Sequence, residues 1–173
     1  MRVLTFSTSF PKGHPKAGSH TFFVERILSC IHDGQIVLDN ICDDLKPFIN
    51  DFELIATGMP KGHTIRAGSR WKAGDMASLR IWSGVPRRSK QIEFAQVEVK
   101  KVWPVEIYIG NLIVEIRIDE MSQSLEQKEV IAKNDGLELI DFVNWFKIHP
   151  KAKKGIAFTG QIITWSPSIN YTP

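Results

Sequence analysis

The run of short strands predicted between residues 76 and 114 is the feature that most restricts the fold of this chain. Residues 76–82 and 91–103 are rich in apolar, β-branched and aromatic side chains, and Ser83-Gly84-Val85-Pro86 separates them with turn-forming residues. Residues 107–114 have the pattern of a hairpin around Gly110-Asn111. Strands joined by such short connections favour an antiparallel sheet.

The segment before these strands is predicted to hold a strand at residues 2–6, an ordered loop at residues 7–20 and a helix. Thr21 can cap this helix, and its apolar side chains recur every four residues as far as Ile31. Gly34 can end it, since glycine adopts the left-handed conformation that closes many helices.

A short helix is predicted at residues 43–50, and further helices follow the strands. Ser124-Leu125-Glu126-Gln127 has the pattern of a capping box for a helix towards residue 133. Residues 139–146 carry apolar side chains on one helical face, and residues 156–165 form a last strand with a bulge at Gly160.

The size and composition of the chain fit one globular domain. A chain of 173 residues can bury a substantial core, and 43% hydrophobic with 24% charged residues is ordinary for such a domain. We therefore expect a single α+β domain, a small and mostly antiparallel β-barrel with flanking helices.

Several classes of function are not supported by the composition. No apolar run is long enough to cross a bilayer, and residues 1–4 lack the apolar core of a signal peptide. Cys30 and Cys42 are too few for a disulfide framework and are expected to be idle thiols in a reducing cytoplasm. The five histidines show no ligand spacing such as His-x-x-x-His, so neither a metal nor a cofactor is predicted. We expect a cytoplasmic protein, a monomer, with no membrane partner.

The segment Lys61-Gly62-His63-Thr64-Ile65-Arg66 concentrates chemistry in six residues. If it is extended, Thr64 and Arg66 lie on one face because side chains alternate along a strand. A bend at Met59-Pro60 can bring Lys61 to the same surface. A plainer explanation is that Lys61 and Arg66 are surface cations and that Thr64 is a strand residue with high β-propensity.

The pattern resembles the ASCH domains, relatives of the PUA fold that occur in RNA-modifying and RNA-binding proteins. Lys61, Thr64 and Arg66 match the Lys-x-x-Thr-x-Arg signature of that family, and Lys72-Ala73-Gly74-Asp75 matches its Lys-x-Gly-Asp. Asp135 stands where the smallest members carry a glutamate before a helix. The resemblance implies a barrel core over residues 52–173, with residues 1–51 as an N-terminal elaboration.

One function implied by the resemblance is binding of RNA or of a modified nucleotide in a basic cleft. Residues 61–101 hold ten basic and three acidic side chains, and such a segment attracts phosphates. His63 would line the cleft, and Trp71 would stack on a base because its basic neighbours suggest a surface position. Trp82 and Trp103 are weaker candidates, since tryptophans in strands are more often core residues. The predicted phosphate contacts are Arg66, Arg70, Lys72, Arg87, Arg88 and Lys90.

The alternative function is hydrolysis of the amide bond in acetylcytidine-type nucleosides, as the smallest ASCH proteins perform it. The resemblance makes Thr64 the nucleophile, Lys61 its base and Asp135 the acidic partner. A threonine hydroxyl needs an adjacent base, and a lysine can serve when burial and a nearby cation such as Arg66 lower its pKa. Local pattern cannot tell whether Asp135 faces Lys61.

Overall fold

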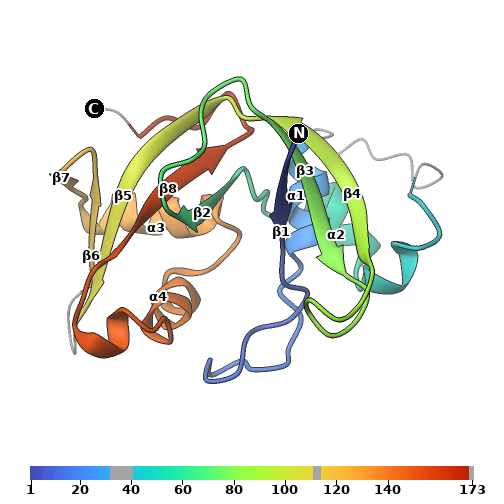
Figure 1. The fold of residues 1–173 in the computed structure, drawn as a ribbon, viewed down its shortest axis with the longest axis horizontal. Coiled ribbons are helices and arrows are strands. Elements are labelled where there is room, and N and C mark those ends of the chain that lie inside the picture. Colours follow the sequence, from blue (N-terminus) through green and yellow to red (C-terminus); the bar gives the residue numbers. More distant parts are fainter. Residues whose placement is uncertain (32–40, 111–113, 172–173) are drawn as a thin grey trace.

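Two sheets build the fold in the computed structural model, which describes residues 1–31, 41–110 and 114–171 (Figure 1). The three-stranded sheet has the order β1-β3-β4, with β1 (Arg2–Thr5) parallel to β3 (Met76–Trp82) and β4 (Gln91–Glu98) antiparallel to it. The five-stranded sheet has the order β2-β8-β5-β6-β7, and each pair of neighbouring strands in it is antiparallel. Its strands are β2 (His63–Ala67), β5 (Lys101–Ile109), β6 (Val114–Ile118), β7 (Met121–Ser122) and β8 (Phe158–Thr164).

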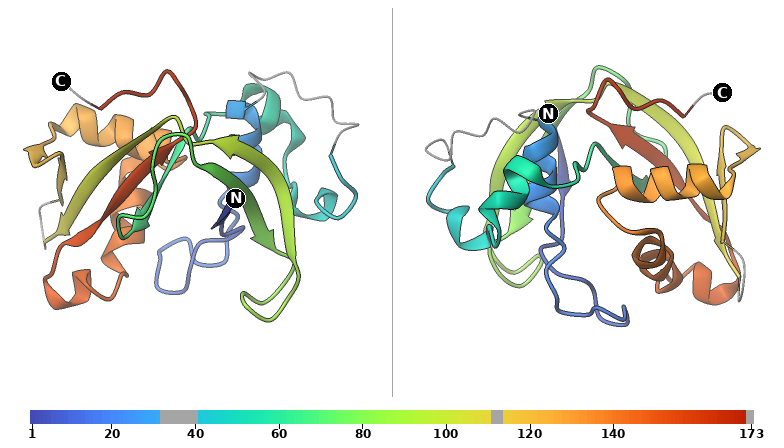
Figure 2. Two further views of the ribbon diagram at one scale, coloured as in Figure 1. Left: turned by 45° about the horizontal axis from the view of Figure 1, so that its top comes forward. Right: turned by 180° about the vertical axis from the view of Figure 1, so that it is seen from behind.

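Each sheet is covered by its own pair of helices. Seen from behind, α1 and α2 lie against the three-stranded sheet, whereas α3 and α4 lie against the five-stranded sheet (Figure 2). The helices are α1 (Phe23–Ile31), α2 (Phe52–Thr57), α3 (Leu125–Asn134) and α4 (Leu139–Lys147), with short 3₁₀ helices η2 (Lys46–Phe48) and η3 (Ala152–Lys154). None of the helices in the described ranges is long and apolar enough to cross a membrane.

The predicted α+β class is confirmed, and the alternation of side chains explains why the sheets bury one face. Along β5, Trp103, Val105 and Ile107 are buried while the residues between them are exposed. These side chains join Ile27 of α1 and Phe142 of α4 in one hydrophobic core. Within the described chain the strands form two separate sheets, and no closed barrel is found.

The strand predicted over residues 91–103 is two strands that belong to different sheets. The amide of Val99 donates to the carbonyl of Asp75, whereas the amide of Lys100 donates to that of Thr164. The backbone therefore changes its partner from the three-stranded to the five-stranded sheet between β4 and β5. Apolar periodicity continues through this crossover, so the pattern did not reveal it.

Three local predictions at helix and strand ends are wrong. Thr21 does not cap α1, because its hydroxyl donates to the carbonyl of Ser7 and the helix begins at Phe23. Residues 43–50 contain only the 3₁₀ turn η2, with Pro47 near its start. Gly160 lies in regular pairing instead of a bulge, and a Cβ there would meet the carbonyl oxygen of Arg66 at 2.2 Å.

Other local predictions are confirmed or fall outside the described residues. The capping box at Ser124 and Gln127 is present, with both of its reciprocal hydrogen bonds. The helix end predicted at Gly34 lies outside the described residues, as does part of the turn at Gly110-Asn111. The nearest described pair across that turn joins Ile109 to Val114.

Candidate active site

Lys61 enters the interior between the two halves of the fold. Its amide donates to the carbonyl of Arg26 in α1, and the next amide, of Gly62, donates to the carbonyl of Asn134 in α3. A Cβ at position 62 would lie 2.6 Å from Cδ1 of Ile169 and 3.1 Å from Cβ of Ser166, so a larger residue there would have to displace these side chains. These contacts fix the backbone so that the side chain of Lys61 lies between α1 and the end of α3. Lys61 is 1% exposed there.

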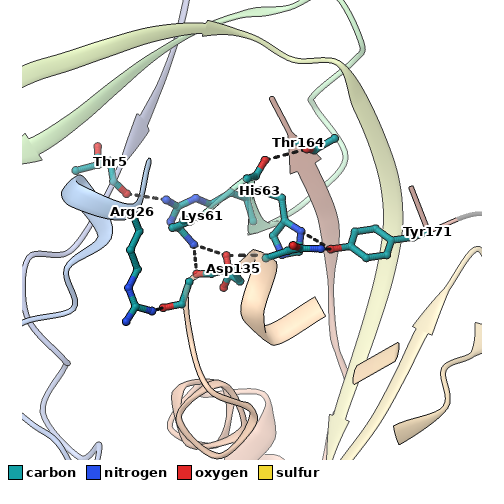
Figure 3. A network of polar contacts seen from close by, with 11 residues as sticks. Thr5, Arg26, Lys61, His63, Asp135, Thr164 and Tyr171 are labelled. Atoms are coloured by element: carbon teal, nitrogen blue, oxygen red, sulfur yellow. Dashed lines mark hydrogen bonds and ion pairs between the residues drawn. The ribbon is translucent and has the colours of Figure 1, made fainter. Parts of the chain in front are cut away.

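The buried amine of Lys61 binds Asp135, which the structure brings to it across 74 positions of sequence (Figure 3). Nζ lies 2.5 Å from Oδ1 of Asp135 and also donates to the backbone carbonyl of the same residue. Asp135 is the C-cap of α3, so the end of that helix presents both oxygens to the amine. The ring of Phe23 covers the other side, with its centroid 4.4 Å from Nζ.

Burial weakens the charged forms of both partners. The pKa of Lys61 is lowered to about 8, with desolvation as the largest cause. The charges of Arg66 and Arg26 act in the same direction, and Asp135 opposes the change. Desolvation likewise raises the pKa of Asp135, although the charges of Lys61 and Arg66 oppose that change. A neutral amine is therefore accessible to Lys61 near neutral pH.

Gly136 shapes the pocket for Lys61. Its φ is +76°, a conformation that glycine adopts without strain. A Cβ at this position would lie 3.2 Å from both Cβ and Cδ of Lys61. The close approach explains why the residue after Asp135 has no side chain.

We expect Gly136→Ala to destabilise the fold by more than the backbone strain alone, which is about 1–2 kcal/mol. Gly74→Ala is the matched control, since Gly74 has a φ of +85° but nothing within 4 Å of its added Cβ. Urea denaturation gives the free energy of unfolding of both variants, and the extra loss in Gly136→Ala is the cost of displacing Lys61. Equal losses would show that Lys61 moves aside freely.

Thr64 and Arg66 follow the predicted alternation along β2. Thr64 is buried, and within the described chain its hydroxyl makes no hydrogen bond, including none to Lys61 or Asp135. Nη2 of Arg66 donates to the carbonyl of Thr5 at 2.8 Å, and its Cζ lies 5.0 Å from the ring centroid of Phe6. Nζ of Lys61 lies 6.0 Å from the same ring, so the two cations share one aromatic neighbour.

His63 is held in one tautomer by a chain of hydrogen bonds that the sequence did not indicate. Nδ2 of Asn134 donates to the hydroxyl of Tyr171 at 2.9 Å, and that hydroxyl lies 2.8 Å from Nδ1 of His63. Among the described residues the hydroxyl of Tyr171 has no acceptor other than Nδ1, and giving its proton to Nδ1 places the imidazole proton on Nε2. Burial and the charge of Lys61 lower the pKa of His63 well below its usual value, so the ring is neutral.

The Nε2–H of His63 is a spare donor beside the Lys61–Asp135 pair. His63 is 0% exposed, and Nε2 lies 3.9 Å from Oδ1 of Asp135, too far for a hydrogen bond. Among the described residues it has no other partner. A buried, unsatisfied donor is costly, so this group is suited to binding an acceptor that arrives with a ligand.

Trp71 is not a surface platform for bases, and that prediction is wrong. Its side chain is 3% exposed, and the guanidinium carbons of Arg2 and Arg70 lie 5.6 and 5.7 Å from its ring. Gln161 further fixes the segment by bonding both the amide and the carbonyl of Trp71. The basic neighbours that suggested a surface position instead cover the ring.

The remaining basic candidates are not bonded to the Lys61–Asp135 pair. Arg87, Arg88 and Lys90 are exposed in the loop between β3 and β4, and Nζ of Lys90 binds Oδ2 of Asp44 at 2.8 Å. Lys72 is also exposed. None of these four makes a hydrogen bond or ion pair with Lys61, Thr64 or Asp135. The predicted residues therefore divide into a buried group and a surface group.

Cavities lie both beside this pair and far from it. One of about 240 Å³ adjoins Arg26 and Gly136, which contact Asp135 or Lys61. A larger one of about 360 Å³ is lined by Glu106, Arg117 and neighbouring residues of β5, β6 and β8 and includes no predicted site residue. In the described part of the chain no group of three or more His, Cys, Asp or Glu side chains is placed to hold a metal ion.

Comparisons with known proteins add no family to this description. No protein-family model, no curated protein and no solved structure matches the chain. The function must therefore be argued from the site itself.

Proposed function

We propose that this protein is an amidohydrolase that removes the acyl group from acetylcytidine-type nucleosides at the Lys61–Asp135 pair. The observation that carries the proposal is the buried amine of Lys61, 2.5 Å from Asp135, with its pKa lowered to about 8. A general base that works near neutral pH needs a pKa close to the pH at which the enzyme operates. Membership among the ASCH-like proteins, with a barrel core over residues 52–173, is part of the same proposal.

In the first step, neutral Lys61 takes the hydroxyl proton of Thr64 while Oγ1 attacks the acyl carbon. The carbon–nitrogen bond then breaks, and the ammonium of Lys61 returns the proton to the leaving amine. An acyl-threonine ester remains. A water molecule, deprotonated by Lys61 in the same way, hydrolyses that ester and restores Thr64.

The neighbours of Lys61 have supporting roles in this scheme. Asp135 positions the amine and stabilises the ammonium that forms transiently. Nε of Arg66 is buried without an acceptor, so it is a spare donor for the oxyanion of the tetrahedral intermediate. The Thr64 hydroxyl makes no hydrogen bond to Lys61 in the described structure, and such catalytic hydrogen bonds often tighten only when substrate binds.

The test is mass spectrometry of acetylcytidine incubated with the protein. We expect cytidine and acetate from the unaltered chain. We expect neither from Thr64→Val, in which a methyl group replaces the hydroxyl. Thr159→Val, at an exposed position of β8, is the matched control and should retain turnover. Equal rates for Thr64→Val and the unaltered protein would remove Thr64 from the mechanism.

Binding of RNA without hydrolysis is the second candidate function. It is favoured by the exposure of Arg70, Lys72, Arg87 and Arg88, none of which has an ion-pair partner in the described ranges. Absence of product from nucleoside and RNA substrates, together with RNA affinity that falls steeply with salt, would support this function over the first.

A further inference from the structure

A cavity of about 240 Å³ lies next to the Lys61–Asp135 pair, between the loop that follows β1, the start of α1 and the turn joining α3 to α4. Pockets that hold whole small molecules are larger, roughly 300–1,000 Å³. The size therefore suits one substituent of a ligand. The charged side chains that line it are Lys16, Arg26, Glu138 and Asp141.

The cavity and the Lys61–Asp135 pair share a wall. Gly136 lines the cavity, and its position is the one from which a Cβ would touch Lys61. Arg26 also lines it, and its carbonyl accepts the amide of Lys61. The side chain of Arg26 runs beside Asp135 and donates through Nη1 to the carbonyl of Gly136 (Figure 3). A ligand group in the cavity would thus be next to the reacting amine.

Arg26 makes no ion pair with either of the carboxylates that line the cavity, Glu138 and Asp141. Asp141 is already bound by Lys16, with Nζ 2.6 Å from Oδ2. Glu138 is exposed and makes no ion pair with Arg26. The charges of Glu138, Glu25 and Asp141 act on the guanidinium only from a distance. Within the described chain no carboxylate lies within 4.0 Å of Arg26. Its Nε is buried with no acceptor, so the guanidinium keeps donors for a ligand.

The loop that closes the cavity is held in a strained conformation. Phe22 has a φ of +56°, which a bulky side chain rarely adopts. Hydrogen bonds on either side of it fix this shape, since the hydroxyl of Thr21 donates to Ser7 and the amide of Arg26 donates to the carbonyl of Phe22. Strain of this kind tends to be retained where it serves a ligand site.

We propose that the cavity binds an anionic oxygen group of the substrate, a phosphate or a carboxylate, through Arg26. This inference rests on the proposed function and specifies its substrate as an acylated nucleoside that carries a negatively charged substituent. A guanidinium presents paired donors that match either group, and burial strengthens the attraction. Lys16 at the rim offers further ammonium donors, although its charge is paired with Asp141.

Equilibrium binding of reaction products tests the inference without requiring turnover. The ligands are cytidine, cytidine 5′-monophosphate and cytidine 5′-carboxylic acid, measured by calorimetry against the full chain. We expect at least one of the anionic ligands to bind roughly tenfold or more tightly than cytidine, the value of one charge-assisted hydrogen bond. The preference between the two identifies the anion.

Two variants and one control locate the binding group. Arg26→Gln should abolish the advantage of the anionic ligands, whereas Arg117→Gln, in β6, should retain it. Lys16→Gln changes a side chain that is 54% exposed and keeps a hydrogen-bond donor beside Asp141, so it is the second variant should Arg26→Gln not fold, and it should weaken only the anionic ligands. Equal affinity for all three ligands would overturn the inference, as would an anion preference unchanged in the variants that fold.

The outcomes also separate this inference from the proposed function. Anion-dependent binding without hydrolysis of any acylated substrate would retain the cavity as a binding site and reject the amidohydrolase. Hydrolysis of acetylcytidine with no preference for anionic ligands would retain the amidohydrolase and reject the cavity.

Discussion

We expect the rate of hydrolysis to rise as the pH is raised through about 8 and to be lost when Lys61 is replaced by Met. A base must be neutral to take a proton, and burial lowers the pKa of Lys61 to about 8. About a tenth of the molecules would hold the neutral amine at pH 7 and about nine-tenths at pH 9. Removing a general base costs about 10²–10⁴ in rate.

The measurement is kcat/KM for acetylcytidine from pH 6 to 10, for the unaltered protein and for Lys61→Met. Lys100→Met is the control, because Lys100 is exposed and its side chain binds only Glu98 among the described residues. It should keep both the rate and the shape of the profile. A profile that does not change with pH, or turnover retained by Lys61→Met, would exclude Lys61 as the base.

We expect Asp135→Asn to destabilise the fold by about 3–5 kcal/mol at neutral pH, the cost of breaking a buried ion pair. Asp135 raises the pKa of Lys61, so its loss lowers that pKa further. The unfolded lysine stays protonated up to about pH 10.5. Unfolding of the variant therefore takes up a proton below pH 8 as well, where Lys61 of the unaltered protein is charged in both states. The stability deficit should shrink as the pH rises to about 8 and then stay constant up to about 10.5.

Urea denaturation at pH 7 and pH 10 measures this effect for Asp135→Asn and for the double variant Lys61→Met with Asp135→Asn. The double variant carries no buried amine, so we expect it to be more stable at pH 7 than Asp135→Asn alone. Because position 61 then carries no ionisable group, the stability of the double variant should not change with pH through that position. An equal deficit of Asp135→Asn at both pH values would show that the ion pair contributes little.

Local pattern was a good guide wherever the cause of the structure lies within a few residues. The extended segment from His63, the capping box at Ser124 and the apolar face of residues 139–147 all follow from neighbouring side chains. Local pattern failed where the backbone changes partner, as between β4 and β5. It also failed at Trp71, whose ring is covered by Arg2, a residue far away in the sequence, as well as by the adjacent Arg70.

The sequence by itself determined the α+β class, most of the strands and helices, and the presence of an amine, a hydroxyl and a carboxylate among the candidate residues. Only the tertiary structure decided that Asp135 meets Lys61, that Asn134 and Tyr171 form a hydrogen-bonded chain to Nδ1 of His63, and that Arg26 has no ion-pair partner among the described residues. The physical reason is that burial, and the pKa of Lys61 with it, depends on contacts between segments distant in the chain, which periodicity and spacing do not encode.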